Sequence, residues 1–278
     1  MEKESKNLLL ILLIIAMFVG TVVEIGEGSP VIGVFLFLMS ILLMTKIDFR
    51  ELTDTNVLKK SRVYLIIGFF IILADIIYNY RISGKLGTLD IMVLFFGVSL
   101  IGTQFQHPQI NRVSQFGAYI SSVFIFFFLI FYELFGFLGV DFLHKFDHYF
   151  ILLPTVEILG LINIPVEVIA TETVRLQGIE DMTIVIGGPC SGLYSMFLLI
   201  GIVFGYSRIE KIDSKKTLML LGFSILVAYI SNLFRVVILY LTAYTYGQET
   251  MMLVHTHIGW IIFAVVAAFI MYFIELKK

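Results

Sequence analysis

Long apolar stretches separated by short polar segments form the main pattern along this chain of 278 residues. A membrane-spanning helix needs about 20 mostly apolar residues. Membrane strands would instead alternate apolar and polar residues over about ten positions. The pattern predicts an all-α polytopic membrane protein with about eight transmembrane helices. They are expected at about 7–24, 30–45, 63–80, 89–103, 117–140, 191–206, 217–244 and 254–275.

The segment from about 141 to 189, between the fifth and sixth predicted spans, has a different pattern. Residues 150–164 favour a helix, but prolines and a glutamate interrupt their apolar run, so we expect this helix at the membrane interface. Two β-prone runs follow at 166–171 and 182–186, with a glycine between them. This arrangement is typical of a hairpin. We therefore predict a small β-hairpin-like insertion before the sixth span.

Basic residues are distributed unevenly between the predicted connecting segments. With the N-terminus in the cytoplasm, fourteen of the 19 Lys and Arg residues fall on the inside and four on the outside. The remaining one, Arg235, falls within a span. Because cytoplasmic loops carry an excess of Lys and Arg, we expect a multi-pass protein with both termini in the cytoplasm. The hairpin-like insertion is then extracytoplasmic.

The composition agrees with this assignment. Hydrophobic residues make up 59% of the chain and charged residues 14%, whereas soluble domains carry about 25% charged residues. No repeat, low-complexity tract or linker divides the sequence, so we expect a single membrane domain of residues 1–278. The net charge of −2 gives no indication of a nucleic-acid partner, and we expect none.

The only cysteine, Cys190, lies in a run that begins with Gly187-Gly188-Pro189 and continues with Ser191-Gly192. The two glycines and the proline end the preceding strand, so Cys190 opens the sixth span at a helix N-terminus. Unpaired backbone N–H groups and the helix dipole favour a thiolate there. Cys190 is therefore the candidate nucleophile, and Ser191 is a candidate hydrogen-bond donor to an oxyanion. The alternative is a buried cysteine without a chemical role.

Asn232 and Arg235 lie in the seventh predicted span, three residues apart and hence on one helix face. An arginine within a span costs several kcal/mol unless it is paired, hydrated or able to extend to the interface. Arg235 could stabilise an anionic group near the outer face, and Asn232 could orient it. A structural pair between Arg235 and Asp75 is the alternative.

His255 and His257 lie at the predicted start of the eighth span, close to Trp260. Histidine titrates near neutral pH and can transfer protons. The two histidines are two positions apart, so we expect at most one of them to face the site. Cys190 and two histidines lack a clear fourth ligand, so we expect no metal.

The predicted topology brings these three groups to the same membrane face. A thiol, a guanidinium and an imidazole together supply a nucleophile, an anion-stabilising group and a proton donor. The motifs Pro189-Cys190-Ser191-Gly192, Asn232-x-x-Arg235 and His255-x-x-x-Gly259-Trp260 resemble those of the archaeosortase/exosortase family, in the same order. The resemblance is concentrated in residues 180–265, the expected catalytic region, and favours the archaeosortase-like branch.

The resemblance implies a cysteine transpeptidase or protease of the plasma membrane that requires no cofactor. Cys190 would match the nucleophile of the family, Arg235 its catalytic arginine and His255 its third catalytic position, while His257 has no matching position. The implied substrate is the C-terminal sorting signal of a secreted protein. Its transmembrane helix would dock among the spans, and a membrane lipid is the expected acceptor at the outer face.

Two other functions compete with this interpretation. An intramembrane serine protease would use Ser191 or Ser195. A transporter or lipid-binding membrane protein would use the arginine and histidines as a substrate path, because ionisable residues within spans often mark such paths.

Overall fold

The fold is described from a computed structural model of the chain. The described residues are 10, 13–14, 17–18, 20–21, 24, 29–44, 61–82, 87–106, 108–187 and 191–276. The structure divides into two compact units. The first comprises Met1–Lys46, Ile130–Ser195 and Leu226–Lys278, and the second comprises Ile47–Leu129 and Met196–Ile225.

Helices packed through small residues form the second unit. It contains α3 (Arg62–Ile82), α4 (Thr88–Gly102), α5 (Pro108–Phe128), and parts of α9 (Leu193–Ile209) and α10 (Ser214–Leu276). A Cβ atom on Gly68 of α3 would lie 2.6 Å from the carbonyl oxygen of Gly97 in α4. Small residues of this kind allow membrane helices to approach closely. Arg112 and Glu210 form an ion pair of 2.6 Å between α5 and the end of α9.

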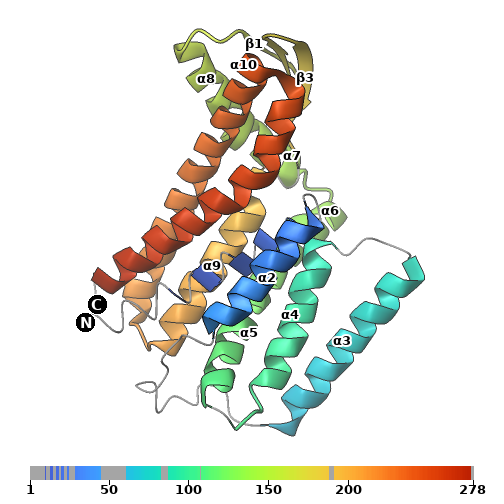
Figure 1. Cartoon of the computed structure of the whole chain (residues 1–278), viewed down its shortest axis with the longest axis vertical. Helices are drawn as coiled ribbons and strands as arrows, with labels where there is room; N and C mark the ends of the chain where they lie inside the picture. The colour runs from blue at the N-terminus through green and yellow to red at the C-terminus, as the bar shows by residue number, and fades with distance from the viewer. Residues whose placement is uncertain are drawn as a thin grey trace. The chain divides into compact units, whose positions relative to one another are not determined.

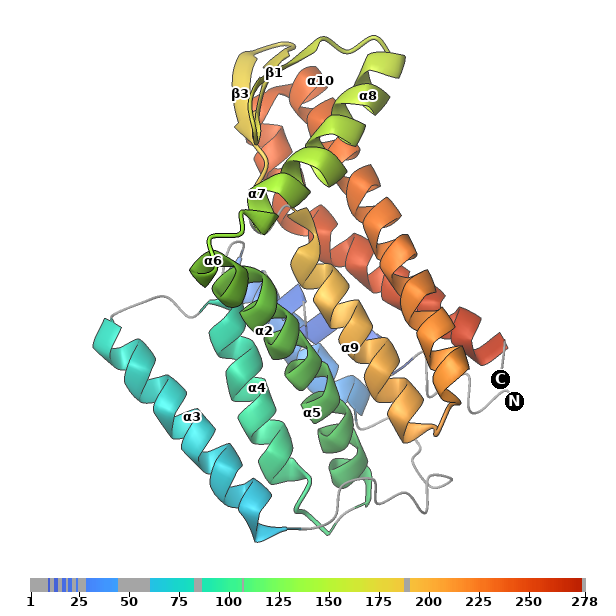
Figure 2. The same cartoon turned by 180° about the vertical axis from the view of Figure 1, so that it is seen from behind.

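The first unit combines helices with the only sheet among the described residues. Its elements outside α9 and α10 include two π-helical turns, η1 and η2. In chain order they are α2 (Pro30–Met44), η1 (Leu129–Leu134), α6 (Phe135–Phe137), α7 (Phe142–Phe146), η2 (Asp147–Leu152), α8 (Leu153–Leu161), β1 (Val166–Ala170), β2 (Thr173–Gln177) and β3 (Asp181–Val185). The sheet and α8 lie beside the turn of α10 in both views (Figure 1, Figure 2).

The sheet corrects the two-stranded prediction. It has three antiparallel strands in the order β1-β2-β3, so β2 separates the two predicted runs. Val174 and Leu176 of β2 are fully buried, whereas the alternate residue Arg175 is exposed. This alternation is the pattern of a strand with one face on a core. In the sequence, the polar residues of β2 are typical of a loop, so this strand was interpreted as the connection between the two predicted strands.

The buried face of the sheet packs on α10. The core of this unit is made of apolar residues from η2, α8, the loop before β1, the strands and α10; they are Ile151, Leu152, Leu159, Ile164, Val174, Leu176, Met182, Ile186, Val236, Val237, Tyr240 and Ala243. Burying an apolar side chain of this size contributes about 1.5–3 kcal/mol. The insertion therefore packs against residues 236–243 of α10 and stabilises this part of the helix.

Helix α10 is two helices joined at a break. Gly247 has φ 82° and ψ 180°, so residues 214–246 form a first arm and residues 248–276 a second arm that turns back. The backbone N–H of Ile179 donates to the Tyr244 carbonyl at 3.2 Å, and the Glu180 carboxylate accepts from the Gln248 N–H at 3.2 Å. The turn between β2 and β3 thus satisfies backbone groups that the break leaves open.

The helices agree in part with the predicted spans. Within the described residues, three apolar helices are long enough to cross a membrane, at Arg62–Arg81, Ile110–Phe137 and Ser214–Ile274. Shorter apolar helices run over Val31–Ser40, Thr88–Gly102 and Leu193–Ile209. Most of the first predicted span lies outside the described residues. A mostly helical chain is confirmed, whereas the number of eight spans stays a prediction.

Replacing Gly247 by alanine should destabilise the protein. Its backbone conformation is nearly exclusive to glycine, and a Cβ atom would lie 3.1 Å from the Glu180 carboxylate carbon. We expect Gly247→Ala to cost about 1–3 kcal/mol, seen as a lower midpoint of thermal unfolding in detergent. Gly222→Ala in the first arm is the control, because no atom lies within 4 Å of its Cβ position. Equal unfolding midpoints for the two variants would contradict the requirement for glycine at position 247.

Candidate active site

The segment that follows Cys190 is fixed against α10. Cys190 itself, with Gly188 and Pro189, lies outside the described residues. Ser191 is only 2% exposed, and its carbonyl oxygen accepts a hydrogen bond of 2.9 Å from Nδ2 of Asn232. Gly192 has φ +78°, and a Cβ atom there would overlap the Asn232 carboxamide. Asn232 therefore anchors the backbone directly after the predicted nucleophile.

Arg235 lies one turn further along the same arm of α10 and contacts the second arm. A Cβ atom on Gly259 would lie 3.2 Å from both Cζ and Nη2 of Arg235. A side chain there would require the guanidinium to shift by a few tenths of an ångström. The Nε atom of Arg235 is buried. Gly259, which the sequence motif contains, thus provides the space in which the guanidinium lies.

His255 shares the helix face of Gly259. The two residues are four positions apart in the second arm of α10, and side chains at this spacing lie one above the other. The face that meets Arg235 at Gly259 therefore carries the imidazole one turn closer to Gly247. Both residues belong to the unit that contains Ser191 and Asn232.

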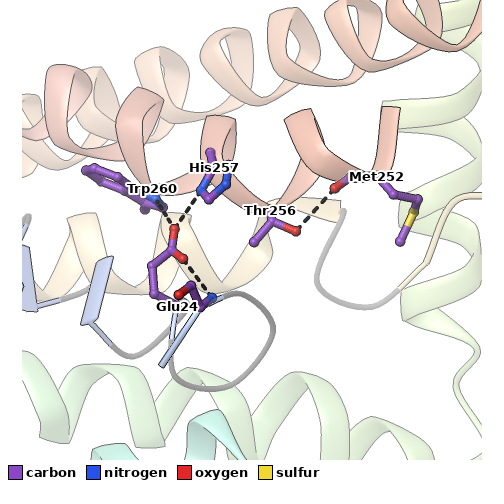
Figure 3. A network of polar contacts seen from close by, with 6 residues as sticks. Glu24, Met252, Thr256, His257 and Trp260 are labelled. Atoms are coloured by element: carbon purple, nitrogen blue, oxygen red, sulfur yellow. Dashed lines mark hydrogen bonds and ion pairs between the residues drawn. The ribbon is translucent and has the colours of Figure 1, made fainter. Parts of the chain in front are cut away.

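His257 belongs to a different contact network (Figure 3). Its Nδ1 donates to Oε1 of Glu24 at 2.6 Å, and Nε1 of Trp260 donates to the same oxygen at 3.2 Å. The other carboxylate oxygen accepts from the backbone N–H of Ser29 at 3.1 Å. Glu24 is fully buried, so its carboxylate holds one face of the second arm. The expectation that the two histidines face different ways is consistent with these contacts.

Two tyrosines adjoin the segment after Cys190. The rings of Tyr132, in η1, and Tyr194, in α9, are 5.4 Å apart. The Tyr132 hydroxyl interacts with the side chains of Tyr194 and Ser191. Sequence reasoning missed both residues, because tyrosines are frequent in apolar stretches and these two are distant in the chain.

A second polar cluster joins the segment between η1 and α8 to the turn between β1 and β2. Nδ1 of His144 and Oε1 of Glu172 are 2.5 Å apart. Asp147, at the start of η2, is 3% exposed, and its Oδ1 has no hydrogen-bond partner among the described residues. Burial, and then the nearby Glu172 carboxylate, raise the pKa of Asp147 to about 7. Hydrogen bonding to Glu172 raises the pKa of His144.

This cluster was not predicted from the sequence. His148 lies on the same segment, and its Nδ1 is 2.7 Å from the Thr171 carbonyl oxygen. Asp147 is buried although it follows a run of aromatic and basic residues. No group of three metal-binding side chains occurs within the described ranges. Cys190 lies outside them, so the absence of a metal stays a prediction.

Asp147→Asn should stabilise the protein at alkaline pH. The pKa of Asp147 rises from its ordinary value of 3.8 to about 7 on folding, so the folded state binds the proton more tightly than the unfolded chain. The free energy of unfolding therefore falls as pH increases between these values. We expect the variant to unfold at a higher temperature than the natural protein at about pH 8, with a much smaller difference at about pH 5. Thermal unfolding in detergent at both pH values measures this, and a difference independent of pH would refute it.

Comparison with known proteins identifies a family. The model of the family described as transmembrane exosortase matches residues 4–272. Searches of curated proteins and of solved structures gave no match. The matched range includes all three sequence motifs, and it covers the Glu24 contacts and the second polar cluster as well.

Proposed function

The chain belongs to the transmembrane exosortase family, and from this premise we propose that it is a membrane-embedded cysteine transpeptidase. In this proposal it cleaves the C-terminal sorting signal of secreted proteins and transfers the new C-terminus to a membrane lipid. The reaction takes place at the outer face of the plasma membrane, and both termini are cytoplasmic. The hydrophobic helix of the sorting signal docks among the membrane helices.

One arrangement carries the proposal. The Asn232 hydrogen bond to Ser191 and the contact of Arg235 with Gly259 join the three motif segments within one unit. These segments are far apart in the chain, and each brings a different chemical group. A thiol next to Ser191, a guanidinium and an imidazole are the groups that acyl transfer through a thioester needs.

The first half-reaction forms an acyl-enzyme. The Cys190 thiolate attacks the scissile carbonyl, and negative charge develops on its oxygen. The Arg235 guanidinium, held against Gly259, and backbone N–H groups near Cys190 stabilise this oxyanion. Losing one such donor typically costs about 10²–10³ in rate. The Asn232 hydrogen bond fixes the backbone on which the nucleophile is carried.

The second half-reaction depends on the acceptor. His255 gives a proton to the leaving amine, the carbon–nitrogen bond breaks, and a thioester remains on Cys190. An incoming amine then attacks the thioester and releases the anchored product. Water in place of the amine would make the protein a protease.

Replacing Cys190 by alanine should abolish processing. The test is a reporter that carries a C-terminal sorting signal from the same genome, expressed with either protein at equal level. We expect the natural protein to shorten the reporter and Cys190→Ala to leave it at full length, because no thioester can form. Mass analysis of the new C-terminus then distinguishes a lipid product from a hydrolysed one.

A control variant sharpens this result. Ser195→Ala should process the reporter normally, which would exclude Ser195 as the nucleophile. Normal processing by Cys190→Ala would overturn the proposal and favour a transporter or lipid-binding role for the arginine and histidines.

The two histidines should differ in their effect on processing. His255 lies on the face that meets Arg235, whereas His257 is bound to Glu24. We expect His255→Gln to lower the initial rate by about 10²–10⁴, the usual contribution of a proton donor. His257→Gln should lower thermal stability and leave most of the rate. The reverse order of rates would assign the proton transfer to His257.

A further inference from the structure

The cluster of Asp147, Glu172 and His144 has no role in the mechanism above, and it has an unusual charge balance. Asp147 is 97% buried, since its exposed fraction is 3%. Its Oδ1 has no hydrogen-bond partner among the described residues. A buried carboxylate oxygen without a donor costs several kcal/mol in a folded protein. The chain retains this oxygen in a place where a neutral residue would be more stable.

The charge of a second carboxylate acts on Asp147. Glu172 acts on Asp147 unfavourably, and His144 acts on it favourably. The single imidazole is already engaged by Glu172 at 2.5 Å. Two carboxylates and one histidine leave negative charge unbalanced when both carboxylates are ionised. A ligand that brings positive charge and N–H donors would satisfy both the charge and the Oδ1 atom.

The cluster is next to the segment that leads into Cys190. The Glu172 carbonyl accepts a hydrogen bond of 2.8 Å from the N–H of Ile186. A Cβ atom on Gly187 would lie 3.9 Å from the Glu172 carboxylate. The Asp147 charge acts on Tyr132, whose hydroxyl interacts with Ser191. The Ile186 hydrogen bond and the action of the Asp147 charge on Tyr132 therefore relate these carboxylates to the residues on either side of Gly188–Cys190.

The backbone at the cluster is unusual in the same places. Tyr132 lies in η1 and Asp147 opens η2, and both are π-helical turns. Such turns are rare and occur frequently at functional sites. A π turn shifts the positions of side chains relative to a regular helix, and here it occurs at both residues that link the cluster to Ser191.

The cluster is also accessible. The His144 side chain is 62% exposed and that of Glu172 is 19% exposed, whereas Asp147 is buried. Solvent therefore reaches His144 and Glu172. Asp147, Glu172 and His144 are not arranged as a three-ligand metal site within the residues described here. An organic cation fits these observations better.

We propose that Asp147 and Glu172 form an acceptor subsite that binds the primary ammonium group of the incoming nucleophile and removes a proton from it. This inference rests on the proposed transpeptidase function. The ammonium transfers one proton to the Asp147 carboxylate, and the neutral nitrogen attacks the thioester carbonyl on Cys190. The carbon–sulfur bond then breaks, and the second proton leaves the nitrogen for the departing sulfur. An amide and a free thiol result.

The experiment compares two nucleophiles on the purified full-length protein with the reporter as acyl donor. Ethanolamine is an ammonium ion at neutral pH and needs deprotonation, whereas hydroxylamine is mostly neutral there and does not. We expect Asp147→Asn to lower the rate of ethanolamine transfer at least about tenfold, in line with the loss of a general base. The hydroxylamine rate should stay within about twofold of the natural protein. Asp141→Asn is the matched control, because Asp141 is exposed on the same segment and should leave both rates unchanged.

Each outcome of this comparison either supports or overturns the acceptor subsite. Equal loss with both nucleophiles, or no loss with either, would overturn the subsite. Because Asp147→Asn is expected to be more stable than the natural protein at alkaline pH, a selective loss of ethanolamine transfer could not come from unfolding. If the natural protein forms no product even with hydroxylamine, the transpeptidase proposal fails.

If the transpeptidase proposal fails, a binding measurement still tests the subsite. Ethanolamine should raise the unfolding temperature of the natural protein and of Asp141→Asn, because a ligand stabilises the state that binds it. It should not do so for Asp147→Asn. A shift of equal size in all three proteins would show that ethanolamine binds elsewhere or not specifically, and would overturn the subsite without reference to catalysis.

Discussion

The contact between Arg235 and Gly259 is the constraint on which the proposed active site depends. A guanidinium in an apolar helix is costly unless its surroundings accommodate it. Here the second arm of α10 has a glycine at the point of contact, so the two arms approach at the level of the charge. That approach requires the chain to reverse within very few residues, which Gly247 does with a backbone conformation nearly restricted to glycine. The sheet then packs on the first arm and hydrogen-bonds across the break. The insertion thereby stabilises the geometry on which the proposed reaction depends.

The local parts of the site followed from helix periodicity. The spacing of Asn232 and Arg235 placed both on one face, and the two-residue spacing of His255 and His257 placed them on different faces. These predictions depend only on the helical repeat of about 3.6 residues per turn. Apolar length also located α2 and α3. The fifth and eighth predicted spans were placed too late, because α5 begins at Pro108 and the second arm of α10 follows Gly247 directly.

Contacts between distant segments could not be predicted in this way. Glu24 and His257 are 233 positions apart, and no pattern in a single sequence indicates that a glutamate at the end of one apolar stretch meets a histidine in another. The burial of Asp147 was hidden for the same reason, because its neighbours in space come from other elements. Strand β2 was missed on different grounds: its polar residues alternate with only two apolar ones, and its burial depends on α10 lying beneath it.

The second arm of α10 is thus held from two sides, and this gives the two histidines complementary roles. Successive helical residues are rotated by about 100°, so positions two apart are separated by about 200°. Glu24 binds the face with His257 and Trp260, while the other face meets Arg235 through Gly259. The buried carboxylate, with donors from two side chains and one backbone group, limits rotation of the arm about its own axis. Such a rotation would turn His255 away from the guanidinium. The Glu24 network therefore supports the second arm on the face away from the proposed site, through Trp260 and Ser29 as well as His257, and so accounts for a fully buried acid far from the proposed nucleophile in sequence.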